Sequence, residues 1–186
     1  MSTSTLEQDT QGQLTEQGFS CGNTWYHGTS SALADTIKQD GLKRSGDPQL
    51  NEATKKTMAT IGNKYTATVE PVFLTQNKAL AHYWAEQKVR ERSVRIEGNE
   101  QAVVFSITLP ESINKQVKPD VGAASLLLVK EGENFMAYVA GLYQEKGLAA
   151  PDINLRSADR LEYLNKLGMA YIDNDIAVDY LTLLEN

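Results

Sequence analysis

The hydrophobic pattern predicts short strands and helices that do not alternate regularly. The most apolar segment, Ala102 to Leu109, is rich in β-branched residues, as is typical of a central strand covered on both faces, and Pro110 ends it. Further strands are predicted at Thr24 to His27, Val72 to Leu74, Ser125 to Val129, Phe135 to Ala140, Met169 to Ile172 and Tyr180 to Leu184. The pattern therefore favours an α+β fold, a split antiparallel-rich sheet with flanking helices, over a doubly wound fold.

Capping residues mark the helices between these strands. Ser30 or Ser31 begins a helix that ends at Gly41, and Thr75 is placed to cap a helix that starts near Asn77. A third helix is predicted between Ser157 and Gly168, and a short one around Asn51 to Ala59. On the second helix an apolar stripe predicts contact with the core, although the Tyr83 ring is also free to reach a neighbouring cleft: Leu80, Tyr83, Trp84 and Gln87.

Polar segments lie outside this pattern. Residues from Met1 to about Phe19 contain few apolar side chains, so the sequence predicts a flexible arm over 1–20 and one folded domain over 21–186. The segment from Lys43 to Glu70 is polar and partly basic, which fits either a functional loop or a solvated surface excursion. The charges around Arg90, Arg92 and Arg95 predict a solvated helix end.

Composition sets limits on the class of protein. The chain has 186 residues, 41% of them hydrophobic, which is enough to bury one core. A net charge of -6 provides no general attraction to nucleic acid or to an anionic membrane. No apolar run is long enough to span a bilayer or to form a signal-peptide core, so we expect a cytoplasmic protein. With one cysteine and two histidines in the chain, we expect no metal.

The segment Trp25-Tyr26-His27-Gly28-Thr29-Ser30 contains the strongest candidate for chemistry. It places a histidine where a predicted strand ends and a helix begins, beside exposed backbone amides. Gly28 has no side chain and so permits close approach of a ligand to the backbone. A capping turn with a merely solvated histidine fits the same residues equally well.

Three motifs together resemble the ADP-ribosyltransferase superfamily, in the branch that includes diphtheria-toxin-like enzymes and poly(ADP-ribose) polymerases. The first is Trp25 to Thr29 followed by a helix, the second is Val72 to Thr75 running into a helix with Trp84 and Glu86, and the third is Val103 to Pro110 leading to Asp120. Their order and spacing look most like the small rifampin ADP-ribosyltransferases. RNA 2'-phosphotransferases share the first motif, but the further histidine and arginines that their chemistry requires are not found here.

The resemblance implies roles for individual residues in binding NAD. His27 would bond a ribose hydroxyl, the Gly28 backbone would hold the carboxamide, and Thr29 would complete this part of the site. Phe73 stands where the family usually has tyrosine, so it retains a stacking surface for nicotinamide but lacks the hydroxyl. Tyr83 would form the second wall of the nicotinamide pocket.

The resemblance also implies a catalytic acid, for which the sequence offers three candidates. Asp120 follows the proline turn as the acid does in the rifampin-modifying enzymes and is the first choice. Glu133 and Glu131 are also candidates because both precede the predicted Phe135 strand; Glu133 is the second choice and Glu131 the third. In the polymerases the acid begins a late strand, which here corresponds to Met169 to Ile172, where no glutamate occurs.

The activity implied by this resemblance is mono-ADP-ribosylation. The enzyme would use NAD as a substrate and transfer ADP-ribose to an acceptor, with protein favoured over nucleic acid or a small molecule and no membrane partner. Such a transferase would act as a toxin, an antibiotic-modifying enzyme or a phage or bacterial factor. The alternative is a non-catalytic module of the same fold that binds NAD or a partner protein.

Overall fold

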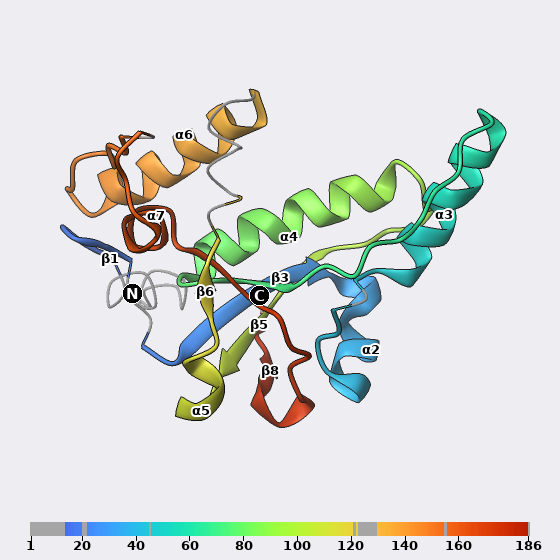
Figure 1. Cartoon of the computed structure of the whole chain (residues 1–186), viewed down its shortest axis with the longest axis horizontal. Coiled ribbons are helices and arrows are strands. Elements are labelled where there is room, and N and C mark those ends of the chain that lie inside the picture. The colour runs from blue at the N-terminus through green and yellow to red at the C-terminus, as the bar shows by residue number, and fades with distance from the viewer. Residues whose placement is uncertain are drawn as a thin grey trace.

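The protein has a mixed α/β fold with an antiparallel sheet of six strands and a separate sheet of two strands (Figure 1). The computed structural model describes residues 14–19, 22–44, 46–120, 122, 130–154 and 156–185. The strand order in the larger sheet is β6-β7-β4-β3-β5-β8. These strands are β3 (Thr24–Ser30), β4 (Val72–Thr75), β5 (Ala102–Thr108), β6 (Lys118–Pro119), β7 (Met169–Ile172) and β8 (Leu181–Leu183).

The larger sheet is split between its two central strands. β3 pairs with β5 along its whole length, whereas β3 and β4 pair only at Tyr26 and Thr75. β4 in turn pairs with β7 along all four of its residues. One half-sheet therefore contains β6, β7 and β4, the other contains β3, β5 and β8, and the two diverge beyond Tyr26. We refer to this divergence, between Gly28 on β3 and Phe73 on β4, as the split.

Helices cover both faces of the sheet. The helices among the described residues are α2 (Ser31–Asp40), α3 (Pro48–Thr60), α4 (Lys78–Ser93), α5 (Glu111–Asn114), α6 (Lys130–Glu145) and α7 (Arg160–Leu167), and a 3-10 turn, η2 (Val178–Tyr180), precedes β8. Figure 1 shows α4 crossing the sheet on the side that also carries α6 and α7, with α2 and α5 on the opposite side. This two-layer cover explains why β5 is nearly continuously apolar.

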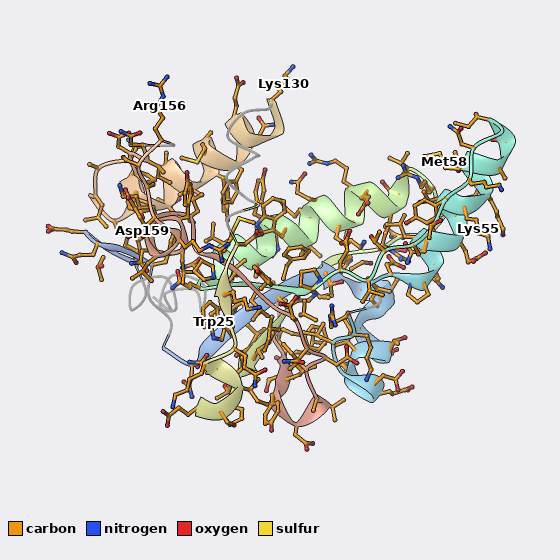
Figure 2. All side chains as sticks on the ribbon, in the orientation of Figure 1. Trp25, Lys55, Met58, Lys130, Arg156 and Asp159 are labelled. Atoms are coloured by element: carbon orange, nitrogen blue, oxygen red, sulfur yellow. The ribbon has the colours of Figure 1, made fainter. Side chains whose placement is uncertain are left out.

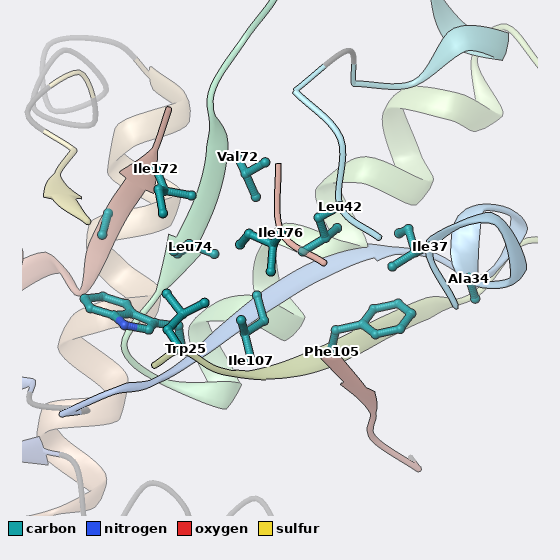
Figure 3. Packing of buried hydrophobic residues seen from close by; sticks show 12 residues of the cluster. Trp25, Ala34, Ile37, Leu42, Val72, Leu74, Phe105, Ile107, Ile172 and Ile176 are labelled. Carbon is teal, nitrogen blue, oxygen red and sulfur yellow. The ribbon is translucent and has the colours of Figure 1, made fainter. Parts of the chain in front are cut away.

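The main core lies on the face covered by α2. Figure 3 shows Trp25, Leu74, Phe105 and Ile107 from three adjacent strands. They pack together with side chains from α2 and with Ile176, which precedes η2. A second cluster joins α4, α6 and α7 on the other side and includes Leu80, Phe135, Val139 and Leu167. Alternate residues of the central strands face the main core on one side and, on the other, a small cluster of Tyr26, Val104 and Ala81 of α4.

The helix ends refine the predicted capping. Ser30 caps α2 by accepting a hydrogen bond from Ala32 N at 3.1 Å, and Gly41 ends it at φ 81°. The α4 cap is Asn77 and not Thr75, whose hydroxyl instead donates to the Asn77 carbonyl at 2.9 Å. The α7 cap is Asp159 and not Ser157, while Gly168 ends that helix in the left-handed conformation, as the sequence indicates.

Two predictions of secondary structure are wrong. Phe135 to Ala140 is not a strand but part of α6, since Phe135, Val139 and Leu142 are all buried at the three- and four-residue spacing of one helix face. Residues 14–19 are not a loose arm, because β1 (Leu14–Thr15) and β2 (Gly18–Phe19) form a hairpin with Leu14 and Phe19 buried. The rest of the predicted arm up to residue 13, and the predicted strand Ser125 to Val129, lie outside the described residues.

The basic end of α4 also differs from its prediction as a solvated face. Arg92 is fully buried, and its guanidinium donates to both carboxylate oxygens of Glu100, at 2.6 and 2.9 Å. It also donates to Asp47 and, at 2.9 Å, to the side-chain oxygen of Gln49. Asp47 caps α3, and Glu100 accepts a 2.5 Å hydrogen bond from Ser30. We call Arg92, Asp47, Gln49, Glu100 and Ser30 the Arg92 network.

The α3 helix projects from the body of the molecule. Figure 2 shows Lys55 and Met58 on this helix, far from the sheet. Leu50 is its one buried residue, and the Tyr65 hydroxyl donates to the Asn51 side chain at 2.9 Å as the chain returns toward β4. The helix predicted around Asn51 to Ala59 is confirmed and begins earlier, because Asp47 caps it and Pro48 suits its first turn.

Candidate functional site

His27 lies in the middle of β3, and not at the end of a strand. The strand continues through Thr29 and Ser30, which pair with Val103 and Ala102 of β5. The expectation of an imidazole at a strand terminus is therefore wrong, because β5 extends the pairing to Ser30. Among the described residues, β3 pairs with β4 only at Tyr26, and this leaves the β4-side backbone beyond Tyr26 outside that pairing.

The imidazole of His27 bridges the split. Its Nδ1 lies 2.8 Å from the carbonyl oxygen of Phe73. Since a carbonyl oxygen can only accept, Nδ1 carries the hydrogen in this contact. A neutral imidazole of this tautomer leaves Nε2 as a hydrogen-bond acceptor, which suits a hydroxyl donor such as that of a ribose.

The protonation state of His27 follows from its surroundings. Burial lowers the pKa of the imidazole below its usual value, the hydrogen bond to the Phe73 carbonyl acts in the opposite direction, and the Lys88 charge lowers it further. The side chain is half-buried, and His27 is directly opposite Phe105, which belongs to the main core. His27 is thus suited to accept a hydrogen bond at neutral pH and not to carry a positive charge.

Gly28 has a structural role beside the predicted one. A Cβ atom at this position would lie 1.8 Å from the Ala81 carbonyl oxygen and 2.8 Å from Ala85 N, so the missing side chain makes room for α4. The backbone of Gly28 remains available to the split. The Tyr26 carbonyl oxygen faces β4, 3.4 Å from Thr75 Oγ1, and the Gly28 amide and carbonyl, two residues on, point to the same side of the strand.

Phe73 and Thr29 occupy different environments. The Phe73 side chain is 44% exposed and lies on the sheet face opposite Leu74, although its carbonyl holds the His27 ring. Its open ring is available for stacking and is not part of the buried core. Thr29 is buried, so its side chain serves packing.

Tyr83 does not reach the split. Its ring packs against Trp84, Phe135 and Tyr138, with centroid distances of 5.3, 5.7 and 4.9 Å. Burial, as the largest effect, raises the pKa of the Tyr83 hydroxyl. The stripe Leu80, Tyr83 and Trp84 therefore joins α4 to α6, as the alternative core interpretation predicts.

Among the candidate acids, the structure fixes the position of Asp120 relative to β3. Asp120 follows β6, where its N–H donates to the Met169 carbonyl at 3.0 Å. Met169 is opposite Thr75, and Thr75 is opposite Tyr26, so three strand spacings separate Asp120 from β3, about 14 Å. Glu133 is exposed on α6, and the Glu131 side chain lies outside the described part of the chain.

A row of side chains that the sequence interpretation missed lies beside Phe73. Tyr171 of β7 is directly opposite Phe73, and Lys118 of β6 is directly opposite Tyr171. The Lys118 ammonium lies 5.8 Å from the Tyr171 ring centroid and 2.8 Å from Asp173 Oδ2. Alternation along Met169 to Ile172 places Tyr171 on the outward face, which is the signal that points to it; Lys118 has no such signal, because β6 is only two residues long.

A hollow of about 180 Å³ lies at the C-terminal end of α4 and contains none of the predicted site residues. Its lining residues are Val89, Ser93, Ile96, Gly98, Asn99 and Glu100. Its one carboxylate, Glu100, is already engaged by Arg92 and Ser30. Within the described residues, no group of three or more potential metal ligands occurs. Over the same part of the chain, no helix combines the length and apolar character needed to cross a membrane.

Comparison of the chain with protein-family models, with curated proteins and with solved structures finds no match. The site must therefore be judged on its geometry. That geometry brings together His27, Gly28 and Phe73 at the split and leaves Tyr83 in the interface between α4 and α6. Asp120 follows β6, at the edge of the half-sheet of β6, β7 and β4.

Proposed function

We propose that the protein is a mono-ADP-ribosyltransferase that binds NAD at the split and cleaves the bond between nicotinamide and ribose. The observation that supports this most is the 2.8 Å contact between His27 Nδ1 and the Phe73 carbonyl, which joins two motif residues 46 positions apart where the half-sheets diverge. The split sheet is, under this proposal, an ADP-ribosyltransferase-like core formed by residues 21–186.

Each residue at the split then has a defined task. His27 Nε2 accepts a hydrogen bond from a ribose hydroxyl, because Nδ1 is held by Phe73. The backbone of Gly28 faces the split and holds the carboxamide of nicotinamide, and the exposed ring of Phe73 stacks on the nicotinamide ring. Together these contacts fix the dinucleotide while positive charge develops on the ribose.

The transfer step needs an acceptor and a base. The bond from ribose C1' to the nicotinamide nitrogen breaks with its electron pair leaving on nicotinamide, and an acceptor nucleophile bonds to C1'. The ionised carboxylate of Asp120 is the proposed base for this step, and it takes the proton of the acceptor. By alternation it shares a sheet face with Lys118 and hence with Phe73, so an acceptor bound along that face can reach both.

A second candidate function, binding of NAD without transfer, is supported by a different observation. Among the described residues, His27 Nδ1 contacts the backbone carbonyl of Phe73 and not a carboxylate. Asp120 lies about 14 Å from β3 by strand spacing. A module that only binds NAD needs His27, Gly28 and Phe73 but no acid at the ribose.

Release of nicotinamide from NAD tests the proposal. We expect the wild-type protein to release nicotinamide, and His27→Ala to lower the rate about 100-fold, the usual effect of removing one transition-state contact. Asp120→Asn is expected to lower the rate similarly with nearly unchanged NAD affinity. His82→Ala, which removes the chain's other histidine on α4, is the matched control and should release nicotinamide at the wild-type rate.

The outcomes separate the two candidates. A folded His27→Ala protein with full activity would mean that the split is not the catalytic site. Saturable NAD binding without nicotinamide release would support the binding module instead. The acceptor class follows from labelled NAD in a cell extract, where label in protein, the favoured acceptor, is distinguished from label in nucleic acid or small molecules.

A further inference from the structure

The row that contains Phe73 runs across the half-sheet of β6, β7 and β4. Lys118, Tyr171 and Phe73 are directly opposite one another on β6, β7 and β4. Side chains in such cross-strand positions lie on the same face with Cβ atoms about 5 Å apart. Extension of the same register across the split leads to Gly28, whose backbone faces the split.

Phe73 and Lys118 in this row are open to solvent and Tyr171 is partly exposed, whereas the alternate residues of β4 and β7 face the core. Phe73 is 44% exposed and the Lys118 side chain 50% exposed, while Leu74, Ala170 and Ile172 are buried. The main core therefore uses one face of β4 and β7, and the exposed Phe73 ring and the partly exposed Tyr171 ring lie on the other. An open pair of rings is a surface on which a flat ligand can stack.

A positive charge stands at the end of this row. Lys118 Nζ lies over the Tyr171 ring at 5.8 Å, so the side chain leans along the row toward Phe73. The hydrogen bond that Lys118 donates to Asp173 raises the pKa of the Lys118 ammonium, which therefore stays charged. An ammonium has three donors, and Asp173 accepts one of them, which leaves donors for another anion.

The spacing of the row matches a nucleotide. Two strand spacings, about 10 Å, separate the backbones of Phe73 and Lys118, and the lean of Lys118 over Tyr171 shortens that span. In NAD one ribose separates the nicotinamide ring from the diphosphate. A ring stacked on Phe73 thus brings a phosphate within reach of Lys118.

We propose that Lys118 binds the diphosphate of NAD, with Tyr171 positioning its side chain along the row. This inference rests on the proposed function, because it takes NAD as the ligand of the split. In the free protein Asp173 holds the ammonium. On binding, the diphosphate shares or replaces that contact, so the Asp173 carboxylate opposes the ligand by like-charge repulsion.

Calorimetric titration of NAD and of nicotinamide alone into matched variants tests this assignment. We expect Lys118→Gln to weaken NAD binding about tenfold or more, as for a lost charge-assisted hydrogen bond, and to leave nicotinamide binding unchanged. Asp173→Asn is expected to strengthen NAD binding severalfold. Lys115→Gln, at an exposed lysine that pairs with Glu111 at 2.7 Å, is the control and should bind NAD as the wild type does.

The opposite effects of the two substitutions on NAD affinity distinguish ligand binding by Lys118 from a purely structural ion pair with Asp173. If the pair served only to join β6 to the loop after β7, Lys118→Gln and Asp173→Asn would have the same effect, because each removes it. Wild-type affinity for NAD in Lys118→Gln would overturn this assignment alone. Absence of NAD binding by the wild-type protein would overturn the proposed function and this assignment together.

Discussion

Replacement of Arg92 by methionine is expected to lower the free energy of unfolding by about 3–5 kcal/mol, the usual cost of breaking a buried ion pair by removing one partner. The guanidinium holds Glu100 through both carboxylate oxygens and also holds Asp47. The Asp47 side chain is almost fully buried, so the variant removes its close partner and leaves only the longer 3.6 Å contact with Lys88. Methionine retains much of the volume but none of the donors.

Chemical denaturation measures this effect, and a neighbouring residue provides the control. Arg90→Met removes an arginine from the same helix whose contact is a long 3.4 Å hydrogen bond to Gln87, so its unfolding free energy should stay within about 0.5 kcal/mol of wild type. Hydrogen bonds from Arg92, as the largest effect, lower the pKa of Glu100. The stability that this lowered pKa contributes is present above the unfolded-state value and is lost as pH falls, so the deficit of Arg92→Met should shrink in acid. Equal stability of the two variants would contradict the Arg92 network.

Replacement of Gly28 by alanine is expected to destabilise the protein by at least about 3 kcal/mol, at the upper end for overpacking. The added Cβ would lie 1.8 Å from the Ala81 carbonyl oxygen, and that neighbour is helix backbone that cannot rotate away. Either α4 or β3 must move. Because β3 carries His27, a displaced strand also disturbs the split.

A second glycine provides the control for this substitution. Gly141 on α6 has no neighbouring atom within 4 Å of an added Cβ, so Gly141→Ala should leave the protein as stable as wild type or stabilise it by up to about 1 kcal/mol. Thermal unfolding of both variants compares them directly. A Gly28→Ala protein that melts at the wild-type temperature would show that α4 does not pack on β3 as described.

Local signals were sufficient to predict most of the fold. The β-branched run of β5, the Ser30 cap and Gly41 end of α2, and the αL glycine after α7 each depend on neighbouring residues alone. The α6 helix was missed because Phe135 to Ala140, taken by itself, has a strand-like composition. Its helical period appears only when Leu142 and Tyr143 are included.

Contacts distant in sequence could not be predicted in the same way. Arg92 looks solvated because its partner Asp47 lies 45 positions earlier, and only the fold brings the two together. The hairpin at 14–19 depends on Gly18 packing against the backbone of Asn165. At the site, the motifs indicated His27, Gly28 and Phe73, while the position of Asp120 depends on β6 pairing at the sheet edge.

The central claim is that NAD binds at the split between β3 and β4, and nuclear magnetic resonance of isotope-labelled protein tests it most directly. On titration with NAD, we predict that the largest shift changes occur at the backbone amides of Gly28 and Phe73 and at the His27 ring nitrogens. Nicotinamide alone should shift Gly28 and Phe73 but not Lys118. Unchanged spectra at millimolar NAD, or changes confined to residues remote from the split, such as those of α3, would contradict the claim.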